Sequence, residues 1–396
     1  MSKRYIIVGS GIAGLSAARA IREDDSNGQI IMFSAEDNLP YSRPMLTKAP
    51  FISFNPDDWT LYDEDWFMEN KIELRLGEPV TKVDTESKIV TTSEGSCSYD
   101  KLIIASGAES FVPPFNGRDK KGIFTIRRTE DIISIKKAYH SHTRAVVIGG
   151  GVIGLEAAVE LARYGASVTV LESMPYLMTR QIDNEISDII CVKLGELGME
   201  VHTGVQISSL DGDTWVESVS LADGRIFPCD FVVVACGVRA VTSMLPDTID
   251  VPRAIAIDDH CRTSAEDVYA AGDCAQYNGV NYALWSQGLM QGYTAGKNAA
   301  GGDVTVGKTD TSLVMNSLEM SLFALGDLGK NPDAEYTIRY RSSKDSPDAF
   351  LVNPPQGEFF EKRYISHGKV VGAAIVGNLS GMQELKDKIN NEEETE

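Results

Sequence analysis

The sequence predicts an α/β fold with two three-layer domains, each built on a parallel sheet, and a small C-terminal α+β domain. Three observations support this prediction. A strand–turn–helix–strand pattern near the N-terminus recurs far downstream, further short apolar strands end in glycine or in an acid, and beyond residue 314 strand-like runs are joined by turn residues.

The length of 396 residues favours two or three domains. We expect a discontinuous first nucleotide-binding domain from residues 1–113 and 241–313, a second from 114–240, and a small domain over 314–396 that ends in an acidic tail. The formal net charge of −20 argues against nucleic acid and against an anionic membrane surface as partners.

The N-terminus enters a strand directly, and its apolar run is too short for a signal peptide. No apolar stretch is long enough to span a bilayer, so we expect a cytoplasmic protein. The six cysteines form no C-x-x-C pair, which favours reduced thiols. The five histidines show no ligand spacing that indicates a metal site.

The first β-α-β unit comprises a strand over Tyr5–Val8, a helix over Leu15–Ile21 and a strand over Gln29–Phe33. The second comprises Arg144–Ile148, a helix over Leu155–Tyr164, and Val168–Leu171. A G-x-G-x-x-G turn lies between strand and helix in each unit. The turns read Gly9-Ser10-Gly11-Ile12-Ala13-Gly14 and Gly149-Gly150-Gly151-Val152-Ile153-Gly154.

Each of these turns is a dinucleotide-binding fingerprint. The first glycine allows a tight turn, the second lets the backbone approach a pyrophosphate, and the third lets the helix pack on the sheet. The helix N-terminus then offers free N–H groups to the phosphate. Two fingerprints in this context predict two nucleotide sites in one chain.

An acid about 20 residues after such a turn binds the ribose hydroxyls of the nucleotide. Glu172 ends the second strand of the downstream unit, and no arginine follows it in Ser173-Met174-Pro175. Its carboxylate would repel a 2′-phosphate, so we expect NADH rather than NADPH. In the first unit Ser34-Ala35-Glu36 follows the strand, which makes Glu36 the counterpart acid.

Three more strands end at chemically distinctive residues. Lys101–Ala105 leads into Ser106-Gly107, Phe231–Ala235 leads into Cys236-Gly237, and Val268–Ala271 leads into Gly272-Asp273. The C-terminal strands are expected over Thr337–Tyr340, Glu358–Ile365 and Val370–Val376.

With these motifs the chain resembles the pyridine-nucleotide–flavin oxidoreductases of the glutathione-reductase fold, which join two Rossmann-type domains to a C-terminal domain. The resemblance covers essentially the whole chain and implies FAD and NADH as cofactors. Val268–Cys274 is similar to the second FAD motif of the family, in which Asp273 would bond the ribityl and diphosphate region.

The segment Pro40-Tyr41-Ser42-Arg43-Pro44-Met45-Leu46-Thr47-Lys48 resembles that of rubredoxin reductases, and is related to the nitrite-reductase flavin domain and to oxygenase-type ferredoxin reductases. Relatives that reduce disulfides carry cysteine here, and this chain carries none. The flavin itself must then pass electrons on.

The resemblance further implies that Lys48 approaches flavin N5 and pairs with Glu156, and these two residues are the expected catalytic pair. Arg43 is similar to the residue that reaches the FAD phosphates, Val80 to the one that contacts adenine, and Trp285 to the one beside the isoalloxazine. The full set of expected cofactor-binding residues is Gly9, Ser10, Gly11, Ile12, Gly14, Ser34, Glu36, Arg43, Pro44, Lys48, Val80, Ser106, Gly107, Gly149, Gly151, Ile153, Gly154, Glu156, Glu172, Gly237, Gly272, Asp273 and Trp285.

Three functions remain open from the sequence. The first is an NADH-dependent reductase of rubredoxin or of a similar one-electron carrier such as ferredoxin. The second is an NADH oxidase or diaphorase that reduces oxygen or small acceptors, and the third is a flavoprotein subunit or redox-sensing binding protein. Both a monomer and a homodimer are compatible with the short C-terminal domain.

A small acidic carrier would need a local basic patch on this acidic chain. The candidate residues for the patch are Arg127, Arg128, Lys136, Lys137, Lys362 and Arg363.

Overall fold

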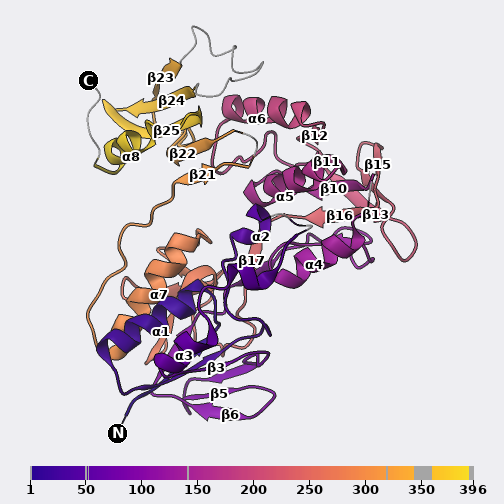
Figure 1. Ribbon diagram of the computed structural model, residues 1–396. Helices are drawn as coiled ribbons and strands as arrows, with labels where there is room; N and C mark the ends of the chain where they lie inside the picture. Colours follow the sequence, from indigo (N-terminus) through magenta and orange to yellow (C-terminus); the bar gives the residue numbers. More distant parts are fainter. Residues whose placement is uncertain are drawn as a thin grey trace. The chain divides into compact units, whose positions relative to one another are not determined.

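The computed structural model describes residues 2–49, 51, 53–140, 142–317, 320–342 and 359–391 (Figure 1). Contacts divide the chain into two units. Unit 1 comprises Met1–Met45, Asn55–Ser110 and Gly237–Asp310, and unit 2 comprises Leu46–Phe54, Phe111–Cys236 and Thr311–Glu396. The expected division into three domains therefore stays a prediction, and the acidic tail lies outside the described residues.

Unit 1 is built on a parallel sheet with the strand order β19-β7-β1-β2-β3. Its strands are β1 (Arg4–Val8), β2 (Gln29–Phe33), β3 (Ile72–Arg75), β7 (Lys101–Ile104) and β19 (Val268–Ala270). The central strands are almost continuously apolar because both faces of the sheet are covered. The mixed α/β fold with parallel sheets confirms the predicted fold class.

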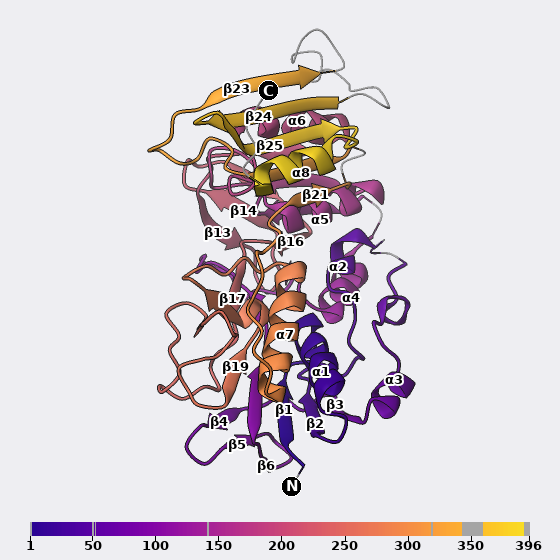
Figure 2. The same cartoon turned by 90° about the vertical axis from the view of Figure 1, so that its left-hand side faces the viewer.

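Helices α1 (Ile12–Asp24) and α7 (Trp285–Ala300) lie side by side in unit 1 (Figures 1 and 2). Small residues make this close packing possible. A Cβ placed on Gly292 would lie 2.1 Å from the carbonyl oxygen of Ala13, and one on Gly296 would lie 2.3 Å from that of Ala17. The two helices are thereby held with their backbones in contact.

The antiparallel meander of β4 (Lys82–Asp84), β5 (Ile89–Thr91) and β6 (Ser96–Ser98) shares the core of the parallel sheet. The remaining elements of unit 1 are two short pairs and three short helices. They are β8 (Ala108–Ser110) with β17 (Val238–Ala240), β18 (Ile255–Ile257) with β20 (Ala275–Tyr277), α3 (Glu64–Glu69), and the 3₁₀ helices η1 (Pro56–Trp59) and η2 (Gly272–Cys274).

Unit 2 contains a second parallel sheet with the order β12-β11-β10-β16-β9. Its elements are β9 (Ile123–Phe124), α4 (Thr129–Ala138), β10 (Arg144–Ile148), α5 (Val152–Arg163), β11 (Ser167–Leu171), α6 (Asn184–Glu196), β12 (Glu200–His202), the ribbon β13 (Ile207–Asp211), β14 (Ser218–Leu221) and β15 (Ile226–Pro228), and β16 (Phe231–Val234). Helix α2 (Met45–Lys48) joins the two units along the chain.

The C-terminal part of unit 2 is an antiparallel sheet with the order β21-β22-β25-β24-β23. Its strands are β21 (Leu313–Met315), β22 (Leu322–Gly326), β23 (Thr337–Ser342), β24 (Phe359–Ser366) and β25 (Lys369–Gly377), and α8 (Met382–Asn391) packs on it. Of the expected strand Glu358–Ile365, Glu358 lies outside the described residues.

Within unit 2 this sheet is tied to α6 by one buried lysine. Lys362, which is 4% exposed, pairs with Asp183, the N-cap of α6, and with Glu185 at 2.5 Å. Its ammonium also lies 5.3 Å from the ring centre of Tyr364. Burial in an apolar setting would lower the pKa of Lys362, but hydrogen bonds to the two carboxylates outweigh it and raise the pKa overall.

Candidate functional site

The second glycine of each fingerprint faces open space. A Cβ placed on Gly11 or on Gly151 meets no atom within 4 Å, whereas one on Gly9 would lie 2.1 Å from the carbonyl oxygen of Ala105 and one on Gly14 would lie 2.0 Å from that of Gly9. The first and third glycines are therefore required by packing. The second leaves the room that a pyrophosphate needs.

The downstream loop repeats this geometry. A Cβ on Gly149 would lie 2.5 Å from the carbonyl oxygen of Ala235, and one on Gly154 would lie 2.0 Å from that of Gly149. Helices α1 and α5 both begin after a glycine N-cap, which has no side chain to cap the first N–H groups. Those groups are suited to phosphate oxygens, so both loops fit the nucleotides that the sequence predicts.

The acid of the first unit lies in a hydrogen-bonded cluster. The Ser10 hydroxyl donates to the Ser34 hydroxyl at 2.9 Å, and the Glu36 N–H donates to Ser34 at 3.2 Å. The Glu36 carboxylate forms an ion pair with Arg43 and accepts a hydrogen bond from the Tyr41 hydroxyl at 2.8 Å. Four of the predicted residues, Ser10, Ser34, Glu36 and Arg43, are thus brought together.

Arg43 also interacts electrostatically with Asp273 of the second FAD motif. Burial lowers the pKa of Arg43, but the charges of Tyr41, Glu36 and Asp273 outweigh it and raise the pKa overall. Asp273 follows Gly272 in η2. The N–H of Gly272 donates to the side-chain oxygen of Gln291 at 2.9 Å. A fixed cation close to both acids is suited to an anionic diphosphate.

The acid of the second unit is held by backbone groups. The Glu172 carboxylate accepts hydrogen bonds from the N–H groups of Gly150 at 2.6 Å and Met174 at 2.7 Å, and from the Ser173 hydroxyl at 3.2 Å. A carboxylate offers about four acceptor positions. The carboxylate is therefore fixed in orientation, and it keeps acceptor capacity for a ribose hydroxyl.

The expected catalytic pair is arranged differently from the prediction. Glu156 is 2% exposed, and its two oxygens accept hydrogen bonds from the hydroxyls of Thr47 at 2.5 Å and Ser317 at 3.1 Å. Lys48 is exposed, and within the described residues no ion pair joins it to Glu156. The expected Lys48–Glu156 ion pair is replaced by Thr47, whose short side chain reaches the buried carboxylate.

The thiols of Cys229, Cys236 and Cys274 are not suited to relay electrons. All six cysteines of the chain are free. Burial raises the pKa of Cys229 to about 12 and that of Cys236 to about 11, and it raises the pKa of Cys274 as well. The thiolate is the reactive form of cysteine, so these thiols are inert near neutral pH.

The other predicted residues lie as follows. Val80 is buried in the core of unit 1, Ser106 donates its hydroxyl to the carbonyl oxygen of Val241 at 2.7 Å, and Trp285 is the first residue of α7. Gly107, Gly237 and Gly272 have positive φ, Ile12 begins α1, Ile153 is exposed on α5, and Pro44 is partly exposed. Their roles toward a cofactor stay predictions.

The expectation that Lys362 and Arg363 belong to an exposed basic patch is wrong. Lys362 is buried between two carboxylates, and Arg363 pairs with Glu361 at 2.5 Å. Both side chains pair with carboxylates, and the sequence alone did not reveal these partners. Lys136 and Lys137 are exposed on α4, and Arg127 and Arg128 precede that helix.

Sequence reasoning missed four polar residues of the site. Tyr41 and Thr47 lie inside the segment that the sequence singled out, so their proximity to Glu36 and Glu156 could have been suspected. Ser317 and Gln291 gave no signal, because their partners lie 161 and 19 residues away along the chain.

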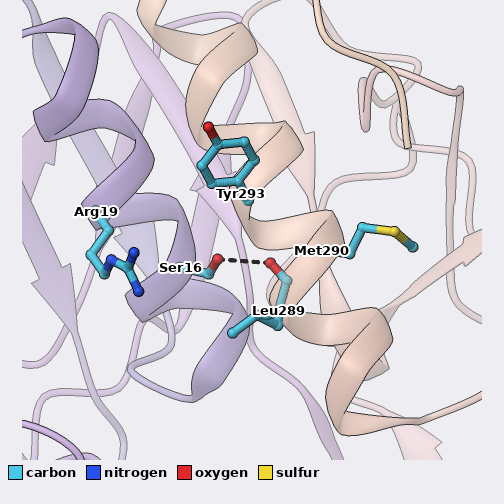
Figure 3. A pocket seen from close by; sticks show the side chains of 5 residues that line it. All are labelled: Ser16, Arg19, Leu289, Met290 and Tyr293. Atoms are coloured by element: carbon cyan, nitrogen blue, oxygen red, sulfur yellow. Dashed lines mark hydrogen bonds between the residues drawn. The ribbon is translucent and has the colours of Figure 1, made fainter. Parts of the chain in front are cut away.

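A surface pocket between α1 and α7 is lined by Ser16, Arg19, Leu289, Met290 and Tyr293 (Figure 3). The Ser16 hydroxyl donates to the carbonyl oxygen of Leu289 at 2.7 Å, which fixes the two helices against each other. The pocket contains no predicted site residue.

A group of Asp258, Asp259 and His260 has ligand atoms within 4.8 Å of one another, but the imidazole already bonds Asp259 and Asp303.

Among the described residues, no helix is long and apolar enough to cross a membrane. The cytoplasmic location stays a prediction.

Comparison with known proteins gives a consistent result. Residues 3–299 match the family described as pyridine nucleotide-disulphide oxidoreductase. The chain is 31% identical over 398 residues to a nitrite reductase [NAD(P)H] of Bacillus subtilis, covering 98% of this chain and 47% of that protein. It is 29% identical over 393 residues to the NADH-rubredoxin oxidoreductase of Clostridium acetobutylicum, covering 98% and 95%.

The crystal structure of the NADH:rubredoxin oxidoreductase from Clostridium acetobutylicum has a TM-score of 0.79 and 27% sequence identity, and the match covers 100% of this chain and 96% of that one. The chain spans about half the length of the first curated relatives it matches.

Proposed function

The chain belongs to the pyridine nucleotide-disulphide oxidoreductase family, and we propose that it passes electrons from NADH, by way of bound FAD, to a small one-electron carrier of the rubredoxin class. It is an NADH-dependent flavoprotein oxidoreductase and binds both FAD and NADH. The acceptor is the proposed part.

The observation that carries the proposal is the absence of a cysteine thiol from the segment that would face the flavin. No cysteine precedes Cys97 in the sequence, so the segment from Pro40 to Lys48 holds none. The thiols of Cys229, Cys236 and Cys274 have raised pKa values and would not serve as nucleophiles. Without a thiol relay, electrons must leave the protein from the flavin itself.

Bound FAD would supply the conversion of a two-electron donor into two one-electron steps. The chain's own residues would bind and orient. Glu172, held by the Gly150 and Met174 N–H groups, would select a ribose without a 2′-phosphate. Arg43 would bind the FAD diphosphate beside Asp273.

The similarity to the NADH-rubredoxin oxidoreductase of Clostridium acetobutylicum supports a carrier of this class, because it extends over nearly the whole length of both chains. We propose that the carrier docks on basic residues of α4, where Lys136 and Lys137 are exposed. Such a patch would attract an acidic carrier to an otherwise acidic protein.

The proposal is tested by steady-state NADH oxidation under anaerobic conditions with rubredoxin, ferredoxin or quinones, and separately with oxygen. Rubredoxin should accelerate NADH oxidation, whereas zinc-substituted rubredoxin, which cannot be reduced, should not. Equal rates with oxygen alone would indicate an oxidase. Flavin reduction without turnover on any acceptor would indicate a redox-sensing binding protein.

A further inference from the structure

Two buried glutamines on α7 carry side-chain atoms without hydrogen-bond partners. Gln287 is 2% exposed and Gln291 is fully buried. The side-chain oxygen Oε1 of Gln287 and the nitrogen Nε2 of Gln291 are buried, and no described residue bonds them. Buried polar atoms are almost always hydrogen-bonded in native proteins, because an unpaired one loses its hydration without replacement.

The two side chains share one face of the helix, since residues four apart lie one above the other. That face is located by Gln291, whose Oε1 accepts the Gly272 N–H at 2.9 Å. Gly288, beside Gln287, lies close to both the first fingerprint and the second FAD motif. A Cβ placed on Gly288 would lie 3.2 Å from the Ile12 side chain and 3.8 Å from Gly272 Cα.

Both glutamines therefore lie next to the residues that the sequence assigns to FAD, namely the start of α1 and the strand end before Asp273. The position is fixed, because Ser16 bonds α1 to the carbonyl oxygen of Leu289 on the same helix (Figure 3). The two unpartnered atoms differ in hydrogen-bonding character. Gln287 presents an acceptor and Gln291 a donor.

We propose that the amide oxygen of Gln287 accepts a hydrogen bond from the ribityl–isoalloxazine part of FAD. That part of the cofactor carries donors, the ribityl hydroxyls and the ring N3–H, whereas the pyrophosphate carries acceptors only. Gln291 is a positioning residue, because its side chain holds the Gly272 N–H and with it the turn that carries Asp273.

Gln287→Leu separates a cofactor contact from a structural one, because the two states of the protein should respond in opposite directions. In the apoprotein the substitution removes an unpaired buried acceptor, so the melting temperature should stay or rise. In the holoprotein it removes a hydrogen bond, so the dissociation constant for FAD should increase roughly two- to tenfold. FAD affinity is measured by quenching of flavin fluorescence on titration of apoprotein.

Two companion variants complete the test. Gln383→Leu changes an exposed glutamine on α8 and should leave FAD affinity unchanged. Gln291→Leu should lower the melting temperature of both apoprotein and holoprotein, since the Gly272 N–H loses its acceptor. If Gln287→Leu does not yield folded apoprotein, Gln287→Met, which keeps the side-chain length, takes its place.

An FAD dissociation constant for Gln287→Leu equal to that of Gln383→Leu would overturn the proposal and indicate that water fills the space. An equal loss of melting temperature in apoprotein and holoprotein would also overturn it, because Gln287 would then be structural. Neither outcome depends on which acceptor the protein reduces.

Discussion

The hydroxyl of Thr47 donates a hydrogen bond to the carboxylate of Glu156, which is buried in helix α5. The other carboxylate oxygen accepts from Ser317, which follows the first strand of the C-terminal sheet. One buried carboxylate thus joins three segments of unit 2 that are far apart along the chain. This arrangement stands where the sequence predicted an ion pair with Lys48.

Thr47→Val should lower the free energy of unfolding by about 1–3 kcal/mol, because the Glu156 oxygen would lose a donor while it stays buried. Thermal unfolding of the variant measures the loss. Ser93→Ala is the matched control, since Ser93 donates to Glu94 at 3.3 Å in an exposed pair. Similar melting temperatures for the two variants would show that the Thr47 bond contributes nothing.

Lys48→Met should slow the reduction of the flavin by NADH on the order of tenfold or more, because a cation beside the flavin would stabilise the charge that develops on it. Since Lys48 is exposed, thermal stability should not change. Stopped-flow absorbance under anaerobic conditions measures the rate. Lys82→Met, at another exposed position, is the control, and a rate equal to that of Lys82→Met would remove Lys48 from the active site.

Glu172→Gln combined with Ser173→Arg should shift preference toward NADPH by at least about tenfold in the ratio of kcat/KM values. The substitutions remove the carboxylate that repels a 2′-phosphate and add an arginine that can pair with this phosphate. Glu172→Gln alone should weaken the binding of NADH without improving that of NADPH. The Gly150 and Met174 N–H groups bond different oxygens of Glu172, and in the glutamine an NH₂ group replaces one of these acceptors. Unchanged preference in the double variant would reject Glu172 as the selecting residue.

Lys362→Met should destabilise the folded protein by about 3–5 kcal/mol, because Asp183 would remain largely buried without its cation. Lys388→Met is the matched control, since Lys388 pairs with Glu384 at the surface and such pairs contribute less than about 1 kcal/mol.

The same pair gives a pH dependence with a defined sign. Burial raises the pKa of Asp183, but its hydrogen bonds to Lys362 and Tyr364 outweigh burial and lower the pKa overall. Its contribution to stability is present above the ordinary aspartate pKa of about 3.9 and is lost as pH falls through the lower folded value. The stability difference between the wild-type protein and Lys362→Met should shrink over that range. A difference that is constant down to pH 2 would contradict the assignment.

The fold was predictable because the two fingerprints constrain backbone as well as chemistry. Gly9 and Gly14 leave no room for a Cβ, so the same residues that predict a phosphate loop also dictate how strand and helix pack. The helices begin earlier than expected, at Ile12 and Val152, since the loop backbone already turns into the helix at the second glycine.

The sequence singled out Glu36 and Arg43, which are close in the chain, and the structure brings these two residues together. The site was not predictable where contacts join distant segments. Nothing in the sequence placed Ser317 against Glu156, or Lys362 against Asp183, because these pairings depend on how the C-terminal sheet packs on the rest of unit 2.

The most direct test of electron flow without a thiol relay is an anaerobic titration of the purified holoprotein with NADH, followed by flavin absorbance. If the flavin is the only centre that stores electrons, about one equivalent of NADH per FAD should bleach it completely, since each carries two electrons. A requirement for about two equivalents would reveal a second two-electron store such as a disulfide, and a flavin that NADH does not bleach would contradict the account altogether.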